Sequence, residues 1–334
     1  MTPGAAPVMA DVARLAGVSH QTVSRVVNAS PKVSAATRSR VLAAMDELGY
    51  RPNATARALA RRHTGIIGVI AFETGKFGPT RTVTAVEHAA RAVGLGLTVT
   101  RAPDDSPDEV TRALHRLRDL AAEGVVVVAS HGTTIGTVAA SPAALPCVHI
   151  GDAVPGIEVG IDGFGGASAA TQHLLGLGHR TVHHVAGPEG WIAADNRLAG
   201  WAAALADAQR PVVAPSAGDW GAASGHAAMA DLLERDPSLT AVFVANDQMA
   251  LGALRAIQDS GRRVPADVSV VGFDDQPEAP YFGPALTTLA PPFAAAGRHA
   301  VRLLAARMSD GDPGSVVVDT GLVLRCSTGP PPAG

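Results

Sequence analysis

The chain has 334 residues and a hydrophobic content of 47%, which is enough to build packed cores and excludes a globally disordered protein. At roughly 150 residues per domain, this length suggests about two domains. The formal net charge of −3 is that of an ordinary acidic protein and does not indicate a nucleic-acid partner. No apolar run reaches the roughly 18–20 residues of a membrane span, and two cysteines are too few for a disulfide framework.

The charge is distributed unevenly along the chain. Residues 1–63 contain nine basic and three acidic side chains and carry a net charge of +6, whereas the rest of the chain carries −9. A small basic segment ahead of a large acidic one predicts an anionic partner for the basic segment. The opening residues MTPGAAPVMA lack a basic region and a long apolar run, so we expect no signal peptide and a cytoplasmic protein.

The first 62 residues predict helices only. Apolar residues at helical spacing indicate a helix over Val8–Ala16, a second over His20–Asn28 and a third over Ala35–Leu48. Ser19 and Ser34 stand where the second and third helices need an N-cap. Two short helices joined by a turn, with a third behind them, are typical of a helix-turn-helix.

The predicted second helix has an apolar side and a polar side. Val23, Val26 and Val27 fall together on a helical wheel and can pack on the first helix. The opposite side carries the hydrogen-bonding residues His20, Gln21, Ser24, Arg25 and Asn28. Glutamine can bind adenine, and arginine can bind guanine, with two hydrogen bonds in the major groove, so this side suits base reading. The alternative is a solvated three-helix bundle whose polar side merely faces water.

From Gly65 onward, short β-rich runs alternate with alanine-rich helical stretches. The predicted strands include Ile66–Ala71, Leu97–Thr100, Val125–Ala129, Cys147–Ile150, Thr181–Ala186, Ala241–Val244 and Val268–Gly272. The predicted helices lie near 81–93, 107–120, 164–177, 194–208, 222–235, 247–260 and 293–309. This alternation predicts parallel sheets built from βαβ units, and the number of strands favours two similar α/β lobes. The Pro- and Gly-rich end, 327–334, is expected to be frayed.

This α/β segment lacks the common catalytic signatures. It contains no GxxxxGK[ST] loop, no GxGxxG opening a helix, no GxSxG, no HExxH and no CxxC. The four histidines between positions 173 and 184 span a helix end, a turn and a strand, so we expect neither a metal site nor a cofactor. Two functions remain open for this segment. One is an α/β enzyme that carries an accessory DNA-binding segment, and the other is a periplasmic-type solute-binding protein.

Residues 9–60 resemble the DNA-binding segment of the LacI family of bacterial transcription regulators. The matching pattern, DVA..AGVS..TVSRVVN...VS..TR..V..AM.ELGY.PN..A..LA, is long and continuous. In that family the first two and the sixth residues of the recognition helix read bases, and here these are His20, Gln21 and Arg25. The further residues assigned to DNA contact are Ser19, Thr22, Ser24, Asn28, Ser34, Thr37 and Asn53.

Residues 53–60, NATARALA, resemble the hinge helix of the same family. Leu59 stands where the family's leucine wedges into the minor groove, and Ala56 lies one turn earlier on the same face. Such a wedge unstacks a base step and bends the duplex at a cost of about a few kcal/mol. Eight residues are too few for a stable isolated helix, so we expect this segment to order only when it pairs with its dimer mate on DNA.

The acidic segment resembles the same family from end to end, most clearly at RLAGW (197–201), VANDQMALGALRAI (244–257) and ADVSVVGFDD (266–275). The resemblance implies a periplasmic-binding-protein-like domain, in which two α/β lobes joined by three crossovers hold a small effector. The implied divisions are a helix-turn-helix at 1–52, a hinge at 53–63, an effector domain at 64–328 and a disordered tail at 329–334. The first lobe would combine 64–160 with 293–320, and the second 161–290 with 321–328.

Positions in the family suggest which residues bind the effector. Asn246 and Asp274 each follow a predicted strand, and ligands of open α/β sheets bind at the carboxyl ends of strands. These two and Arg197 would bind ligand hydroxyls, while Trp220 and Phe293 would stack on a sugar. A structural role is the alternative for the three polar side chains, in the case of Arg197 a salt bridge.

The first lobe departs from the pattern of a galactoside-binding member. Val128 and Gly151 stand where that member has an asparagine and an aspartate facing its sugar, and Phe72 occupies a pocket position. A galactoside is therefore disfavoured, and another saccharide is expected. Two neighbouring residues have structural predictions, Asp247 as an N-cap and Trp201 in the core.

These features predict a dimeric repressor that binds a pseudo-palindromic operator in double-stranded DNA. A saccharide effector would change the angle between the lobes and so release or tighten DNA binding. The chain ends in STGPPPAG and lacks the leucine-heptad tail with which one family member forms tetramers, so a homodimer is expected.

Overall fold

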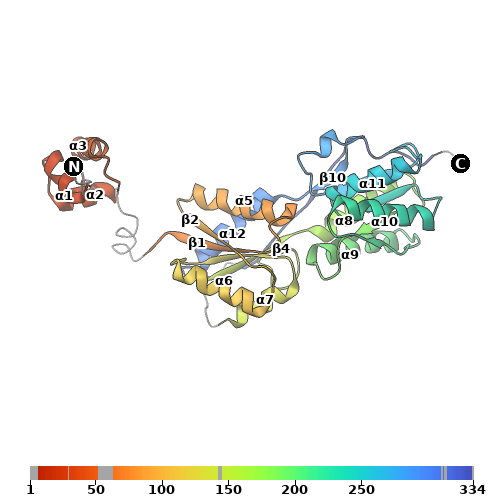
Figure 1. Ribbon diagram of the computed structural model, residues 1–334, viewed down its shortest axis with the longest axis horizontal. Helices are drawn as coiled ribbons and strands as arrows, with labels where there is room; N and C mark the ends of the chain where they lie inside the picture. The colour runs from red at the N-terminus through yellow and green to blue at the C-terminus, as the bar shows by residue number, and fades with distance from the viewer. Residues whose placement is uncertain are drawn as a thin grey trace, which may run out of the picture. The chain divides into compact units, whose positions relative to one another are not determined.

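The computed structural model describes residues 7–28, 30–51, 63–141, 145–309, 311 and 314–332. The chain forms two compact units, residues 1–64 and 65–334, which we call the head and the body and describe separately (Figure 1). The predicted hinge residues Asn53, Ala56 and Leu59 lie outside the described residues.

The head contains the three predicted helices, with ends that differ from the prediction by at most one residue. They are α1 (Met9–Ala16), α2 (His20–Val27) and α3 (Ala35–Leu48). Val12, Val23 and Val41, one from each helix, are fully buried in a common apolar core. Because the valines of α2 face this core, the polar side of α2 is left for solvent.

Serine side chains cap α2 and α3, as predicted. The Ser34 Oγ accepts a hydrogen bond from the Thr37 amide at 3.3 Å, and Ser19 caps α2 in the same way. We expect Ser34→Ala to destabilise the start of α3 by about 1 kcal/mol, because a helix-start amide loses its acceptor. Hydrogen exchange at the Thr37 amide in the full chain should become roughly fivefold faster. Ser39→Ala, an exposed change within α3, should not accelerate exchange there; equal rates in both variants would contradict the capping role.

The body contains two six-stranded sheets, one in each lobe (Figure 1). The first has the order β11-β5-β4-β3-β1-β2 and all its strand pairs are parallel. Its strands are β1 (Ile66–Ala71), β2 (Gly96–Arg101), β3 (Val125–Ala129), β4 (Cys147–Asp152), β5 (Val159–Ile161) and β11 (Val316–Val318). The second has the order β12-β10-β9-β8-β6-β7, with β12 antiparallel to β10 and the other pairs parallel. Its strands are β6 (His183–Ala186), β7 (Ser216–Ala217), β8 (Ala241–Val244), β9 (Ser269–Phe273), β10 (Thr287–Ala290) and β12 (Gly321–Val323).

Helices pack on both faces of the sheets. The first lobe has α5 (Phe77–Ala92), α6 (Pro107–Asp119), α7 (Gly132–Ala140) and α12 (Phe293–Arg307). The second lobe has α8 (Gly163–Gly176), α9 (Ile192–Asp207), α10 (Ala222–Arg235), α11 (Asp247–Asp259) and the 3₁₀ turn η1 (Ala279–Tyr281). In the first lobe, α5 and α12 share a core with one sheet face, and α6 shares a core with the other. The chain passes between the lobes after β5, β10 and β11, which is the two-lobed architecture that the sequence predicts.

Residues 327–329 are anchored, contrary to the predicted frayed segment and disordered tail. Ser327 is fully buried, and its Oγ donates to the Val270 carbonyl at 2.6 Å. The Gly329 amide donates to the Ser269 Oγ at 3.0 Å, and the Gly329 carbonyl lies 3.0 Å from His179 Nε2. The prediction is therefore wrong for residues 327–329. Pro- and Gly-rich composition cannot show that a segment pairs with the neighbouring strand, here β9.

Candidate functional site

The predicted base-reading residues stand on the exposed face of α2. His20, Gln21 and Arg25 are exposed, whereas Val23 and Val26 on the opposite face are buried. Because the buried valines hold α2 on the head's core, the three polar side chains keep a fixed spacing along the helix. This spacing is what a helix that enters the major groove requires.

Ser24 and Asn28 lie at the carboxyl-terminal end of α2 and are half-buried. The Asn28 Nδ2 donates to the Ser24 carbonyl at 2.9 Å and so helps to end the helix. This hydrogen bond gives Asn28 a structural role beside its predicted contact with DNA.

A shallow basin of about 310 Å³ lies between the starts of α2 and α3. Three cations line it, Arg25, Lys32 and Arg40. The predicted DNA contacts Ser19, Thr22, Ser34 and Thr37 line the same basin. Cations and helix N-termini both favour anions, so the basin suits a phosphate group of a nucleic-acid backbone.

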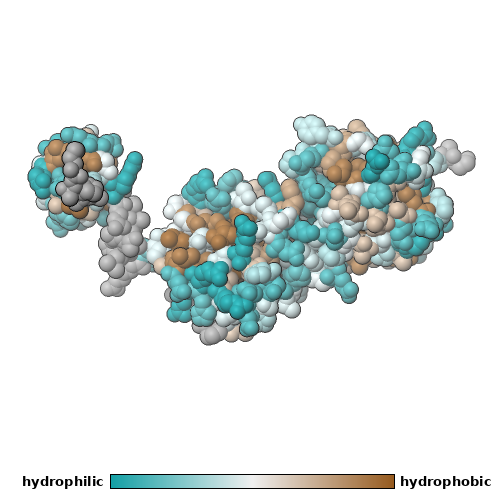
Figure 2. Space-filling view, viewed as in Figure 1, coloured by the Kyte–Doolittle hydropathy of each residue, from teal (hydrophilic) through white to brown (hydrophobic). Residues whose placement is uncertain are grey.

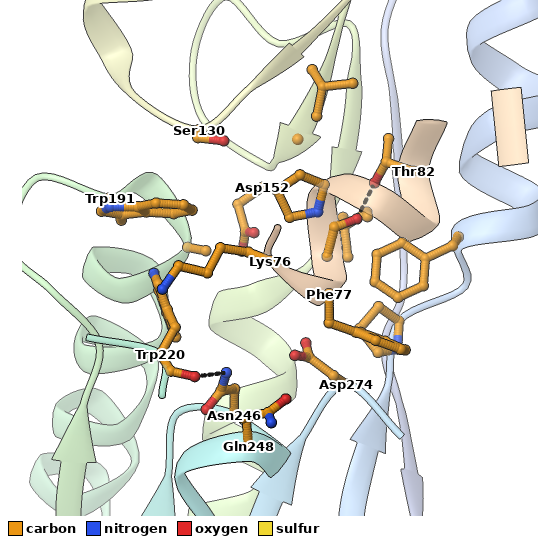
Figure 3. Close-up of a pocket in the computed structure, with 18 of the residues that line it drawn as sticks. Lys76, Phe77, Thr82, Ser130, Asp152, Trp191, Trp220, Asn246, Gln248 and Asp274 are labelled. Atoms are coloured by element: carbon orange, nitrogen blue, oxygen red, sulfur yellow. Dashed lines mark hydrogen bonds between the residues drawn. The ribbon is translucent and has the colours of Figure 1, made fainter. Parts of the chain in front are cut away.

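The body contains a cavity of about 280 Å³ between its lobes, where the parallel strands end (Figure 3). This volume is near the lower end of the roughly 300–1,000 Å³ that small-molecule sites occupy. Five of the six predicted effector residues line it: Arg197, Trp220, Asn246, Asp274 and Phe293. These residues are far apart in the sequence. The structure brings them together from four segments of the second lobe and from α12.

Phe72 is the predicted effector residue that lies elsewhere. Its ring is 1% exposed and belongs to an apolar core that includes Val110 and Leu114 of α6. The expectation that Phe72 contacts the effector is therefore wrong. Phe77, the first residue of α5, lines the cavity instead, because a turn separates it from β1 and reverses the direction of the chain. At that turn Glu73 has a φ of 46°, which the sequence pattern does not reveal.

The first lobe also supplies a carboxylate that the sequence comparison missed. Val128 and Gly151 line the cavity, and so does Asp152, the last residue of β4. Burial raises the pKa of Asp152, while the Arg197 charge and a hydrogen bond from Asn196 oppose the rise. The predicted strand ended at residue 150, so the acidic side chain at its true end was not considered.

Arg197 is the cation at the second-lobe side of the cavity and is 7% exposed. One Nη donates to the Ala245 carbonyl at 2.5 Å, and the other lies 3.6 Å from the Asp274 Oδ1. The guanidinium carbon is 3.6 Å from the centre of the Phe273 ring. The structural salt bridge is thus present, yet the Arg197 Nε has no hydrogen-bond partner within the described part of the chain.

Asp274 combines burial with an unusual backbone conformation. It is 7% exposed, and its φ of 112° is rare for a residue other than glycine. Such conformations cost of order 1–3 kcal/mol and cluster at functional sites. Burial raises the pKa of Asp274 to about 7, with the Arg197 charge lowering it and the Asp152 charge raising it further. Near neutral pH, Asp274 therefore changes between a carboxylate that accepts hydrogen bonds and a neutral acid.

The raised pKa of Asp274 predicts a pH dependence of stability. The folded protein keeps a proton that the unfolded chain, with the ordinary pKa of 3.8, has lost. The free energy of unfolding therefore falls as pH rises from about 4 to about 7, by at most about 4 kcal/mol for this group. Urea unfolding at about pH 5 and about pH 8 should show a smaller difference in Asp274→Asn than in the unchanged protein.

A matched variant separates this effect from a general loss of charge. Asp267 is a partly exposed carboxylate away from the cavity, and hydrogen bonds from Arg263 lower its pKa to about 2. Its contribution to stability is complete above about pH 4 and is lost only below it. Asp267→Asn should therefore leave the difference between the two pH values unchanged. If Asp274→Asn also leaves the stability difference between the two pH values unchanged, the raised pKa of Asp274 is contradicted.

Asn246 connects the cavity wall with α11. Its Oδ1 accepts a hydrogen bond from the Met249 amide at 2.8 Å, and its Nδ2 donates to the Trp220 carbonyl at 3.2 Å. The predicted N-cap at Asp247 is therefore wrong, because Asn246 caps the helix. Asp247 is its first residue, fully buried, and accepts from the Gln276 amide at 2.8 Å. Burial raises the pKa of Asp247 to about 8.

Two pairs of aromatic rings line the cavity. Trp191 and Trp220 of the second lobe meet edge to face, with ring centres 5.6 Å apart. Phe77 and Phe293, at the starts of α5 and α12, meet in the same way at 6.2 Å. Figure 3 shows the two tryptophans on one side of the cavity and Phe77 on the other. Aromatic faces of this kind can cover the apolar face of a sugar ring.

Two other predictions for the second lobe concern residues outside the cavity. Trp201 is 1% exposed, and its Nε1 donates to the Val182 carbonyl at 2.9 Å, which confirms its core position. The four histidines between positions 173 and 184 have separate partners. Among the described residues, no group of three side chains is placed to hold a metal ion.

Known proteins match both units of the chain. Residues 8–53 match the family described as bacterial regulatory proteins, lacI family, and residues 171–328 match a periplasmic binding protein-like domain. The lactose operon repressor of Escherichia coli strain K12 is 36% identical over 322 residues, covering 95% of this chain and 89% of the repressor. The HTH-type transcriptional regulator CelR of Thermobifida fusca is 36% identical over 335 residues, covering 96% and 97%.

Solved structures show the same similarity in three dimensions. The lac repressor dimer bound to operator and the anti-inducer ONPF has a TM-score of 0.86 and 35% identity, covering 97% of this chain and all of that one. A CelR–cellobiose complex has a TM-score of 0.71 and 35% identity, covering 96% and 99%. Such identity extends over nearly the whole chain, including the head and the lobes that form the cavity. The protein therefore belongs to the LacI family of bacterial transcription regulators.

Proposed function

We propose that the protein is a repressor that binds a pseudo-palindromic operator as a homodimer. The observation that carries this proposal is the exposed face of α2, on which His20, Gln21 and Arg25 project away from the head's core. Side chains near the start of a recognition helix reach base edges in the major groove. Two identical heads would read two half-sites, so the symmetry of the dimer predicts the symmetry of the operator.

Phosphate contacts would add affinity without sequence preference. Lys32 and Arg40 line the cationic basin beside the starts of two helices, next to Arg25, whose predicted role is base reading. Operator affinity should therefore fall steeply as salt rises, since bound cations release counterions from the duplex. Leu59 would wedge into the minor groove at the operator centre, with Ala56 and Asn53 contacting DNA nearby.

The surface of the body supports self-association. Figure 2 shows apolar residues gathered on both lobes, between hydrophilic regions. Leu251 of α11 is 44% exposed, and Tyr281 of η1 is 86% exposed. Contiguous exposed apolar regions, unlike single apolar residues, mark surfaces that bind a partner. We propose that these apolar regions bury each other in a homodimer.

The cavity would bind a saccharide effector. Its lining combines the carboxyl groups of Asp152 and Asp274 with the amide side chains of Asn246, Gln248 and Gln276 and with aromatic rings. A polyhydroxy ligand supplies hydroxyl donors for the carboxyl oxygens, acceptors for amide groups and apolar faces for aromatic rings. Two related solved structures are complexes with ONPF and with cellobiose, which supports this ligand class.

Effector binding would act on DNA through the angle between the lobes, and so through the pairing of two hinge segments around Leu59. The coupling is reciprocal, so an effector that weakens operator binding must itself bind more weakly to the operator complex. We further propose that the protein acts in the cytoplasm on chromosomal DNA and does not turn over its ligand. None of the described helices is long and apolar enough to span a membrane.

Selection of bound fragments from a random DNA library tests this function directly. The purified full chain should enrich an inverted repeat, and a panel of sugars should contain one that changes its affinity for the enriched DNA. Enrichment of unrelated sequences with equal affinity would contradict operator recognition. Conversion of a sugar to a product by the purified protein would favour the enzyme hypothesis.

A further inference from the structure

A lysine spans the effector cavity from one lobe to the other. Lys76 is the N-cap residue of α5, and its Nζ donates to the Asp219 carbonyl of the second lobe at 2.8 Å. In Figure 3 its side chain runs from beside Phe77 toward Trp220. The aliphatic part of the lysine therefore lies between the tryptophan pair and the phenylalanine pair. The two pairs are separate platforms for a ligand rather than one continuous aromatic surface.

Each platform is held in place by its surroundings. The Arg197 guanidinium lies 5.5 Å from the centre of the Trp220 ring, and a Cβ on Gly187 would collide with that ring. The centre of the Trp191 ring lies 5.1 Å from the centre of the His131 ring. On the opposite side, the Arg81 guanidinium lies 5.9 Å from the centre of the Phe77 ring. Rigid rings pre-organise a site, because little side-chain entropy remains to be lost on binding.

The polar groups of the cavity lie between the platforms. Figure 3 shows Asp152 and Asp274 between the tryptophan side and Phe77. Lys76 and Arg197 contribute the two positive charges of the lining. Both already have acceptors within the protein: the Asp219 carbonyl for Lys76, and the Ala245 carbonyl with the Asp274 carboxyl group for Arg197. An anionic ligand would have to displace one of these contacts, whereas a neutral ligand would not.

We propose that the effector is a neutral saccharide of two rings, with one ring on the tryptophan pair, the other on the phenylalanine pair, and hydroxyls of both facing the central aspartates. The ligand lies along the direction of the Lys76 side chain and spans the same gap between the lobes. A single ring contacts one platform and leaves the other in contact with water. This inference rests on the proposed saccharide effector and specifies its size and charge.

Titration calorimetry with the purified full chain tests the proposal. The probes are cellobiose, maltose, sucrose and trehalose, together with glucose, fructose and glucose 6-phosphate. At least one disaccharide should bind ten or more times more tightly than any of the three one-ring compounds. Phe77→Leu should reduce this ratio to near one, since it removes the second platform but keeps an apolar side chain. Phe164→Leu, which changes a 45% exposed ring outside the cavity, should preserve the ratio.

The outcomes separate this inference from the proposed function. A one-ring sugar that binds as tightly as every disaccharide would overturn the two-ring inference and leave the saccharide effector standing. Tighter binding of glucose 6-phosphate than of any neutral sugar would overturn the inferred neutrality. No binding to any sugar would contradict both proposals. Equal thermal unfolding midpoints of the two variants without ligand would exclude misfolding as the cause of a reduced ratio.

Discussion

Asp274→Ala is expected to abolish the response to the effector while sparing operator binding in its absence. The carboxylate lies in the cavity and is held 3.6 Å from the Arg197 guanidinium. Hydrogen bonds to a charged group contribute about 1.5–3 kcal/mol each, so the effector should bind more than tenfold more weakly. Loss of Asp274 also leaves the buried Arg197 charge uncompensated. Fluorescence anisotropy of labelled operator DNA, with and without effector, measures both properties.

Asp231→Ala is the matched control for this variant. Asp231 is exposed on α10 and pairs with Arg235 one helical turn later, away from the cavity. Surface pairs of this kind contribute roughly 0–1 kcal/mol, so this variant should respond to the effector as the unchanged protein does. A normal effector response in Asp274→Ala would remove Asp274 from the binding site. If Asp274→Ala fails to bind operator even in the absence of effector, Asp274 has a structural role instead.

Arg25→Ala is expected to weaken binding to the best operator by about 1–3 kcal/mol and to relax specificity at one position of each half-site. Arg25 is exposed at the sixth position of α2, and Val26 beside it is buried and fixes the helix on the head. Binding measured against operators with each base substituted in turn shows whether the preference is lost at a single position.

Lys32→Ala provides the contrast, because Lys32 lines the cationic basin but lies outside α2. This variant should weaken binding to all sequences about equally. It should also lower the number of counterions released on binding, which the salt dependence of the affinity measures, by about one. If Arg25→Ala also weakens binding uniformly and leaves the base preferences intact, Arg25 contacts a phosphate and does not read a base.

Most of the fold could be predicted from the sequence because its longer elements carry a clear hydrophobic period. Strands β1 and β3 and helices α3 and α10 begin and end where the pattern places them. The strands that were not predicted, β5, β7, β10, β11 and β12, have two to four residues each. Segments this short show no periodicity, and pairing with a neighbour decides their conformation. The nine-residue helix α7 was also missed, since its Gly- and Thr-containing sequence has low helix propensity.

The candidate site could be predicted where a residue lies just past a predicted strand or in a continuous match to the family. Asn246 and Asp274 meet both conditions and line the cavity. Phe72 and Phe77 show where this reasoning fails, since the turn between them decides which ring faces the ligand. Trp191 was missed for a different reason, because it enters the cavity from the start of a helix and no strand pattern indicates it.

In the proposed mechanism, ligand binding between the lobes changes the affinity of the head for its operator. The most direct test is to measure both sides of that coupling with the full chain: operator affinity with and without effector, and effector affinity with and without operator. Both affinities should change by the same factor, at least about fivefold. An effector that binds in the cavity with the same affinity in the presence and absence of operator would contradict this mechanism.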